Sequence, residues 1–206
     1  MTVNQNDLRW QRTARQIKDA LITELNRISF NQLTIATLIK TAKISRRAFY
    51  LHYQDKYDLL HQLEKQLTNE LEVAFQHDHE SFIQALGNRR ELWQQNYVLF
   101  TNVLQLVNQE RSLFRALLSV NGDLTFRQTL WQLTAEEITT RIKLYHAEFN
   151  DLIPAKYAIV LVTDGLIGLI IAWINNPHPE SVANFSKVVT NSQLVAPLDL
   201  ISPTTK

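Results

Sequence analysis

Residues 34–53 read TIATLIKTAKISRRAFYLHY, and this stretch decides the fold class. Thr34 and Ser45 are good N-cap residues, so each is expected to start a short helix, over 35–42 and 46–52. The residues between the two helices leave room only for a tight turn. Two helices this short cannot bury their own apolar faces. The pattern therefore predicts a helix-turn-helix whose apolar faces are covered by neighbouring helices.

Helices with an apolar stripe are expected on both sides of this segment. Before it, a helix from residue 7 or 8 to 28 repeats apolar residues at spacings of three and four: Ile17, Leu21, Leu25 and Ile28. After it, Asp55 caps a long helix from 56 to about 76 with a leucine-rich stripe: Leu59, Leu60, Leu63, Leu67, Leu71 and Phe75. These two helices are expected to cover the apolar faces of the two short helices.

The rest of the chain is also expected to be helical. Only four Gly and five Pro occur, which is too few for a fold of many strands and turns. Further helices are expected over 82–86, 91–108, 110–119, 123–150, 154–176 and 180–190. The polar stretch His77–Glu80 is expected to join two modules.

The predicted fold class is all-α, with two domains and a tail. An N-terminal three-helix helix-turn-helix DNA-binding module occupies 1–60, and a long helix to about 76 connects it to the next domain. A C-terminal helical domain occupies 77–190, and its role as a ligand-binding and dimerisation domain is implied by the family resemblance given below. Residues 191–206 contain two prolines and are expected to form a loose tail.

The charge is divided unevenly along the chain, although the net charge is only +1. Residues 1–60 carry ten Lys and Arg against five Asp and Glu, whereas the remainder carries eleven against fifteen. Such a division suggests that the N-terminal part meets a polyanion, although a solvated basic face would show the same excess.

The second short helix concentrates hydrogen-bond donors. If its apolar residues face inward, Arg46, Arg47, Tyr50 and His52 can face a partner. Arg at the start of such a helix suits the major groove of DNA, where it can grip O6 and N7 of guanine. An ordinary amphipathic helix would explain the apolar spacing but not this concentration of donors.

The order of residues over 33–60, LTIATLIKTAKISRRAFYLHYQDKYDLL, resembles the TetR family of regulators. The Thr-capped helix, the turn into Ser, the Phe-Tyr and His-Tyr pairs, and the Lys before a Leu-Leu step occur in the family's order. The resemblance covers about the first 60 residues. It implies that seven residues contact DNA: Thr34, Ser45, Arg46, Arg47, Tyr50, His52 and Lys56.

The resemblance also implies the kind of contact. Thr34 would offer its hydroxyl and a helix N-terminus to a phosphate. The serine and the two arginines would reach base edges or flanking phosphates, while the tyrosine and the histidine would touch the backbone. Lys56 would bind a phosphate with help from the helix dipole.

Two residues depart from the family's pattern. Lys43 stands in the turn where the family usually has Gly, and a left-handed turn there costs about 1 kcal/mol, so a slightly different turn is expected. Ile39 stands where the family often has Ala, and this bulkier side chain could change the packing between the two short helices.

Residues 157–174 are almost continuously apolar, which leaves two interpretations. About 20 such residues can cross a membrane, but Asp164 near the centre would cost about 2.5–3.5 kcal/mol there. A helix that is apolar all round can instead be buried on several sides. The family resemblance implies a four-helix dimer interface, so we expect a homodimer through 154–190, where Gly165 and Gly168 allow close approach.

Weaker patterns in the second domain do not assign a site. The stretch Asp164–Pro177 resembles a subgroup of the family that includes activators of dihydroxyacetone kinase operons. Central aromatic residues are expected to form core or to line an effector pocket, which stays unassigned. The residues His77–Glu80 have poor spacing for a metal site, and no catalytic arrangement or cofactor motif is evident.

The expected function is that of a non-enzymatic, sequence-specific DNA-binding transcription regulator, a repressor released by a small-molecule effector. The alternatives are an activator that requires a protein coactivator, a helical enzyme, or a membrane-anchored adaptor. No apolar segment that would form a signal peptide occurs at the N-terminus, and there is no Cys, so a cytoplasmic protein without disulfides is expected.

Overall fold

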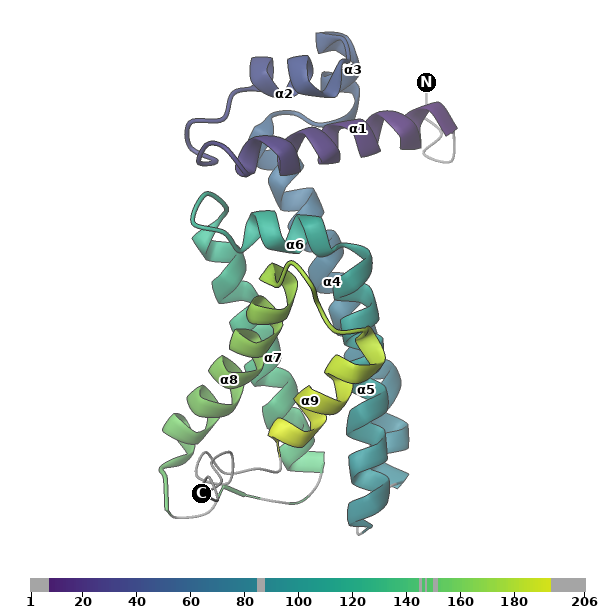
Figure 1. The fold of residues 1–206 in the computed structure, drawn as a ribbon, viewed down its shortest axis with the longest axis vertical. Helices are drawn as coiled ribbons and strands as arrows, with labels where there is room; N and C mark the ends of the chain where they lie inside the picture. Colours follow the sequence, from purple (N-terminus) through teal and green to yellow (C-terminus); the bar gives the residue numbers. More distant parts are fainter. Residues whose placement is uncertain (1–7, 85–87, 145, 147, 150–151, 194–206) are drawn as a thin grey trace, which may run out of the picture. The chain divides into compact units, whose positions relative to one another are not determined.

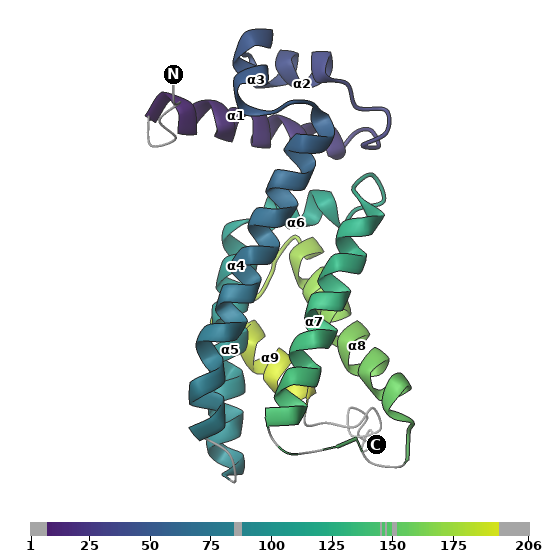
Figure 2. The same ribbon diagram turned by 180° about the vertical axis from the view of Figure 1, so that it is seen from behind.

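A computed structural model of the protein describes residues 8–84, 88–144, 146, 148–149 and 152–193, with only the backbone described for 77–84 and 89. This part of the chain forms nine helices and no strand (Figures 1 and 2), which confirms the all-α fold class. The helices are α1 Leu8–Leu25, α2 Ile35–Ala42, α3 Arg46–His52, α4 Lys56–Gln84, α5 Arg89–Gln109, α6 Arg111–Leu117, α7 Leu124–Leu144, α8 Ala155–Asn175 and α9 Val182–Ser192.

The chain folds into two compact units whose boundaries differ from the predicted domains. The first unit comprises 1–68 and 110–128, and the second comprises 69–109 and 129–206. The sequence had assigned 110–128 to the second domain. That segment belongs to the first unit because Lys18 Nζ donates to both carboxylate oxygens of Glu110, at 2.8 and 2.9 Å.

The turn between α6 and α7 also binds the end of α1 within the first unit. The side-chain amide of Asn121 donates to the backbone carbonyl of Leu25, and the backbone carbonyl of Asn121 accepts from the Phe30 N–H at 2.9 Å. Gly122 permits this tight turn, since a Cβ there would lie 2.0 Å from the carbonyl oxygen of Leu117. The contact joins residues nearly a hundred positions apart, so no local sequence pattern predicts it.

The predicted linker at His77–Glu80 is wrong, because α4 continues through it as one helix to Gln84. Residues 82–84 of the separate helix predicted over 82–86 also belong to α4, so that helix is not separate, and 85–86 lie outside the described residues. Polar side chains do not end a helix, and 76–84 contain neither Gly nor Pro to break its hydrogen bonds. The side chains of His77–Glu80 lie outside the described residues.

The core of the first unit is formed by the predicted stripe of α1 and by residues from the three helices that follow it. Ile17, Leu21, Leu38, Phe49 and Leu59 are completely buried. Burying such a side chain contributes about 1.5–3 kcal/mol each. This core holds α2 and α3 against α1. The flanking helix therefore covers the apolar faces of the two short helices, as the sequence predicted.

In the second unit, aromatic side chains join helices. The Trp93 and Tyr97 rings of α5 stack on each other, and the Trp93 indole N–H donates to Asn191 of α9. Trp173 of α8 stacks on Phe185 of α9, with ring centroids 4.8 Å apart. These aromatic residues therefore pack the helices together, as one of the two sequence interpretations expected.

Glu64 on α4 is a half-buried carboxylate in the first unit with an unusual titration. Its Oε1 atom is buried and has no hydrogen-bond partner among the described residues. Burial, and secondarily the negative charge of Asp123, raises the pKa of Glu64 from 4.5 to about 7. The carboxyl group therefore binds its proton more tightly in the folded state than in the unfolded state.

We expect this group to make stability fall as the pH rises. Its contribution is fully present below pH 4.5 and is lost as the pH rises to about 7. Solvent screening of a half-buried group leaves about 1–2 kcal/mol. Urea unfolding at pH 5 and pH 8 should show this loss in the wild type and a smaller one in Glu64→Gln. The exposed Glu72→Gln is the control. An equal loss in both variants would contradict the assignment.

Candidate nucleic-acid interface

The predicted helix-turn-helix is present with the predicted bounds, and side chains cap both short helices. Thr34 Oγ1 accepts from the N–H of Thr37, and Ser45 Oγ accepts from the N–H of Ala48, both at 3.1 Å. Each cap satisfies a backbone donor that the helix itself leaves unpaired. The N-termini of α2 and α3 are thus fixed by the residues that the sequence identified.

The turn between the two helices is left-handed at Lys43, with φ 54° and ψ 43°. The sequence had predicted a slightly different turn, because a side chain makes this conformation unfavourable by about 1 kcal/mol. The next residue offsets that cost, since the Ile44 N–H donates to the Ile39 carbonyl and closes the helix end. The turn therefore keeps its left-handed form without glycine.

The outer surface of α3 carries most of the predicted DNA-contacting side chains. Phe49 is completely buried and fixes the inner side of the helix. On the outside, Arg46, Arg47 and Tyr50 are exposed, and so are both N-cap residues. The Arg46 guanidinium lies 5.9 Å from the centroid of the Tyr50 ring. Five of the seven predicted residues are therefore accessible to a partner, and we refer to these five together as the α2–α3 surface: Thr34, Ser45, Arg46, Arg47 and Tyr50.

His52, the last residue of α3, has an intramolecular partner that the sequence did not predict. Its ring stacks on Trp10 of α1, with centroids 3.6 Å apart and planes inclined by 26°. Burial lowers the pKa of His52. The histidine thus fastens the first turns of α1 to the end of the helix that presents Arg46 and Arg47.

Lys56, predicted to bind a phosphate, uses its ammonium group within the chain. Its Nζ atom donates to the carbonyl oxygens of Phe30, Asn31 and Leu33, at 2.9, 3.1 and 2.8 Å. An ammonium group has three N–H donors, and this arrangement uses all of them. The geometry therefore favours a structural role for Lys56, which anchors the loop that leads into Thr34.

A further contact between α1 and α2 was missed by the sequence reasoning. Glu24 is only 6% exposed, and one of its carboxylate oxygens accepts from the Thr41 hydroxyl at 2.5 Å. The signal was present, because Glu24 shares the apolar stripe of α1 with Ile17 and Leu21. A carboxylate at such a position needs a buried partner, and this one ties α2 to α1.

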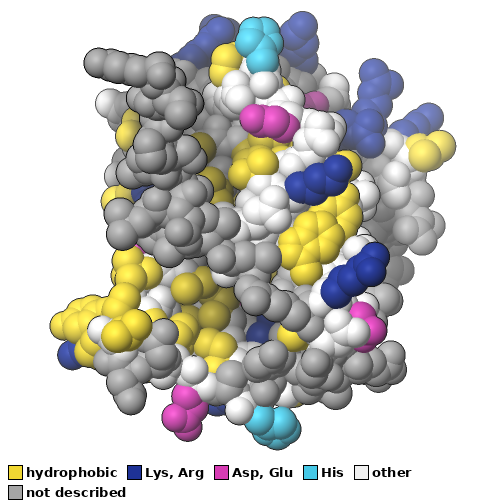
Figure 3. Space-filling view, turned by 60° about the horizontal axis from the view of Figure 1, so that its bottom comes forward, with side chains coloured by type: hydrophobic (Ala, Val, Ile, Leu, Met, Phe, Trp, Pro, Cys, Tyr) yellow, Lys and Arg dark blue, Asp and Glu magenta, His cyan; other side chains and the backbone are white. Residues whose placement is uncertain are grey.

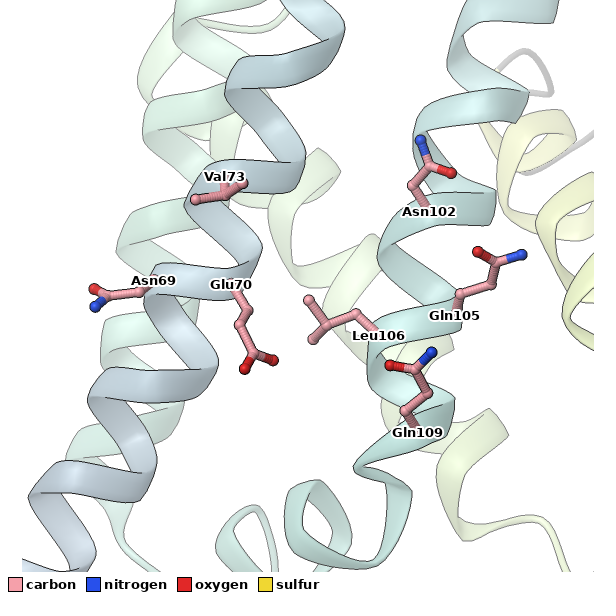
Figure 4. A pocket seen from close by; sticks show the side chains of 7 residues that line it. All are labelled: Asn69, Glu70, Val73, Asn102, Gln105, Leu106 and Gln109. Atoms are coloured by element: carbon pink, nitrogen blue, oxygen red, sulfur yellow. The ribbon is translucent and has the colours of Figure 1, made fainter. Parts of the chain in front are cut away.

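The second unit contains a groove between α4 and α5 with a volume of about 430 Å³. Figure 4 shows Glu70 and Leu106 projecting into the space between the two helices. The groove is lined mainly by amide side chains rather than by the central aromatic residues: Asn69, Glu70, Val73, Asn102, Gln105, Leu106 and Gln109. Its lining suits a polar occupant rather than an extended apolar one.

One side of α8 in the second unit is apolar and exposed. Tyr157 and Leu161 are 55% and 60% exposed, and Cβ atoms added at Gly165 and Gly168 would meet nothing within 4 Å. We call this side the α8 face. Other hydrophobic side chains are visible on the side of the molecule drawn in Figure 3. Only 28% of the most apolar part of α8 is buried by the described residues, and an exposed apolar surface of this kind is typical of an interaction site.

By length and composition α8 could also cross a membrane, with a mean hydropathy of 2.2. Asp164 lies on this helix, and one of its carboxylate oxygens accepts from the Trp131 indole N–H at 2.9 Å. The helix also packs on α9 through Trp173. A single apolar helix with such contacts to its neighbours is weak evidence for a membrane span.

Comparison with known proteins gives consistent matches. Residues 93–193 match the TetR_C_8 family, described as the C-terminal region of transcriptional regulators. An uncharacterized HTH-type transcriptional regulator of Bacillus subtilis (strain 168), YxbF, is 25% identical over 48% of this chain. The match covers 34% of that relative, so the chain corresponds to about a third of its length.

Solved structures show the same fold. A TetR transcriptional regulator from Streptococcus agalactiae 2603V superposes with a TM-score of 0.56 at 19% identity, over 88% of this chain and 93% of that one. The dihydroxyacetone kinase operon activator DhaS gives a TM-score of 0.50 at 14% identity, over 88% and 94%. Both the fold and the C-terminal match agree with the helix-turn-helix, and the chain is a member of the TetR family of transcription regulators.

Proposed function

We propose that the protein binds specific double-stranded DNA through the α2–α3 surface and regulates transcription without catalysing a reaction. The observation that carries this proposal is the exposed pair Arg46 and Arg47 at the capped start of α3. The buried Phe49 fixes the orientation of that helix. A helix held in this way can enter the major groove with its N-terminal residues against base edges.

A gel-shift titration tests the proposal. The DNA upstream of the protein's own gene is compared with random DNA of equal length, at several salt concentrations. Specific binding should be about 10³-fold or more tighter than random binding. Equal affinity for both DNAs, in every upstream fragment tried, would contradict sequence-specific recognition and leave only an electrostatic surface.

The proposed assembly is a homodimer through 154–190, with the α8 face at its centre. This face is exposed and apolar, and its glycines leave space for the backbone of a second helix. A partner copy of α8 and α9 would cover it in the cytoplasm, where lipid is absent. Two helix-turn-helix units in a dimer would meet two half-sites about one helical turn of DNA apart.

Replacing Gly168 by arginine should dissociate this dimer. The new side chain would place a charge and a long stem in the centre of the α8 face, while arginine favours the helix more than glycine does. The monomer should therefore stay folded. Sedimentation velocity should show mainly monomers, with operator affinity reduced at least tenfold. Gln128→Arg, on an exposed part of α7, is the control. A dimeric Gly168→Arg protein would place the interface elsewhere.

We propose further that the protein is a repressor released by a small-molecule effector bound in the second unit. The polar groove between α4 and α5 supports this proposal, since it offers amide and carboxylate partners to a polar ligand. An activator that requires a protein coactivator is the alternative, favoured by the operon activator among the structures of the same fold. A reporter gene behind the operator separates the two, because deletion of a repressor raises expression and deletion of an activator lowers it.

A further inference from the structure

Most of α5 is polar on its exposed positions but carries no charge. Residues 92–109 contain no Asp, Glu, Lys, Arg or His. An amphipathic helix usually carries charged side chains on the side away from the core. On α5 the polar positions are filled mainly by carboxamides: Gln94, Gln95, Asn96, Asn102, Gln105, Asn108 and Gln109. Solvent would accept lysine or glutamate at these positions equally well, so the absence of charge favours a neutral partner.

Three of these carboxamides line the groove between α4 and α5. Asn102, Gln105 and Gln109 are spaced by three and four positions, so they lie along one side of α5. Asn69 adds a fourth carboxamide from α4, and Figure 4 shows the two helices that carry these side chains. A carboxamide has both N–H donors and an acceptor oxygen. The groove therefore offers donors and acceptors together at four positions.

The other lining residues restrict the charge of an occupant. Glu70 is the only charged side chain among the described residues that line the groove, and it is half-buried. Its carboxylate would repel an anion, and no Lys or Arg in the lining would offset that repulsion. Val73, which is 65% exposed, and the half-buried Leu106 offer aliphatic contacts. Two such residues are too few to hold an apolar ligand but can cover one side of a polar one.

We infer that the groove between α4 and α5 binds a neutral polyhydroxylated small molecule, a sugar or a polyol. A hydroxyl group donates and accepts at once, as a carboxamide does, so the ligand and the four carboxamides can satisfy each other. Leu106 and Val73 would contact the C–H groups of the ligand. A groove of about 430 Å³ has the size of a small-molecule site. The inference rests on the proposed effector binding, and it names the chemistry of the effector.

Isothermal titration calorimetry with matched neutral and charged ligands tests the inference. D-Sorbitol and D-glucose should bind with dissociation constants in the millimolar range. D-Gluconate has the carbon chain of D-sorbitol but a carboxylate, and it should bind about fivefold or more weakly because Glu70 repels it. Glu70→Gln should remove this difference. Tighter binding of D-glucosamine than of D-glucose, lost in Glu70→Gln, would identify a cation site and overturn the inference.

Substitutions on α5 locate the binding. Asn102→Leu and Gln109→Met keep the approximate size of the side chain but remove its carboxamide. Each should weaken D-sorbitol binding about two- to tenfold, the effect of one hydrogen bond. Asn108→Leu is the matched control, because Asn108 is an exposed carboxamide of the same helix that does not line the groove. An equal loss in Asn108→Leu, with unchanged circular dichroism, would place the binding elsewhere and overturn the inference.

The remaining outcomes separate this inference from the proposed function. If no member of a panel of neutral pentoses, hexoses and polyols binds, the inference is overturned, and so it is if the blocked peptide N-acetylalanine amide binds in their place. A wild type that recognises its operator but binds no polyol contradicts the inference alone. A polyol that binds in the groove and leaves operator affinity unchanged supports the site and contradicts the proposed effector role.

Discussion

Lys56→Met should lower the free energy of unfolding by about 3 kcal/mol. The substitution keeps the length of the side chain but removes the ammonium group that binds the carbonyl oxygens of Phe30, Asn31 and Leu33. Hydrogen bonds to a charged group contribute about 1.5–3 kcal/mol each, and neighbouring bonds are not additive. The ammonium also lies 4.9 Å from the centroid of the Phe30 ring, which adds to the loss.

Urea denaturation measures this effect, and Lys65→Met is the matched control. Lys65 is on the same helix, is exposed, and should tolerate the change within about 0.5 kcal/mol. The same variants decide between the structural role and the phosphate contact that the family resemblance implied. A structural Lys56 leaves the salt slope of DNA binding unchanged once the protein is folded. A slope lower by about one with unchanged stability would instead restore the phosphate contact.

Alanine at Arg46 or Arg47 should reduce discrimination between operator and random DNA by about 1–3 kcal/mol, roughly five- to 150-fold, for at least one of the two. Both side chains are exposed at the start of α3. Arg46 lies over the Tyr50 ring, an arrangement that directs it along the helix. We therefore expect the larger loss of discrimination at Arg47.

The measurement is a titration of each variant against operator and random DNA at the same salt concentrations. If the replaced arginine contacts a base edge, the variant loses affinity for operator DNA while its affinity for random DNA changes little. If the replaced arginine contacts a phosphate, the variant loses affinity for operator and random DNA equally, and the salt slope falls by about one. Unchanged operator affinity in both variants would show that the α2–α3 surface does not recognise the DNA sequence. Lys65→Ala controls for the loss of one positive charge away from this surface.

The residues around the turn show why so much of this site could be predicted from the sequence. A cap, a tight turn and an apolar spacing are local, because each depends on residues within four positions of one another. The bounds of α2 and α3 therefore agreed with the prediction to the residue. The order of these local signals also carried the family resemblance, which the matches of the C-terminal half then supported.

The roles of Lys56 and His52 show what the local pattern could not decide. A lysine at the start of a helix can meet a phosphate or three carbonyl groups of its own chain, and only the position of the loop at Phe30 settles which it does. The same holds for His52, whose ring is stacked by Trp10 more than forty residues earlier. A family resemblance gives the residue type at such a position, but it does not give the group that this residue contacts in the folded chain.

The sequence by itself determined the helical class, the caps and turn of the helix-turn-helix, and the apolar stripes that bury α1 against α3. Each of these follows from short-range periodicity and backbone preferences. The tertiary structure decided that α4 continues past His77 and that 110–128 join the first unit. Those results depend on contacts such as Lys18 with Glu110, between segments distant in the chain, whose free energy exists only once both are folded together.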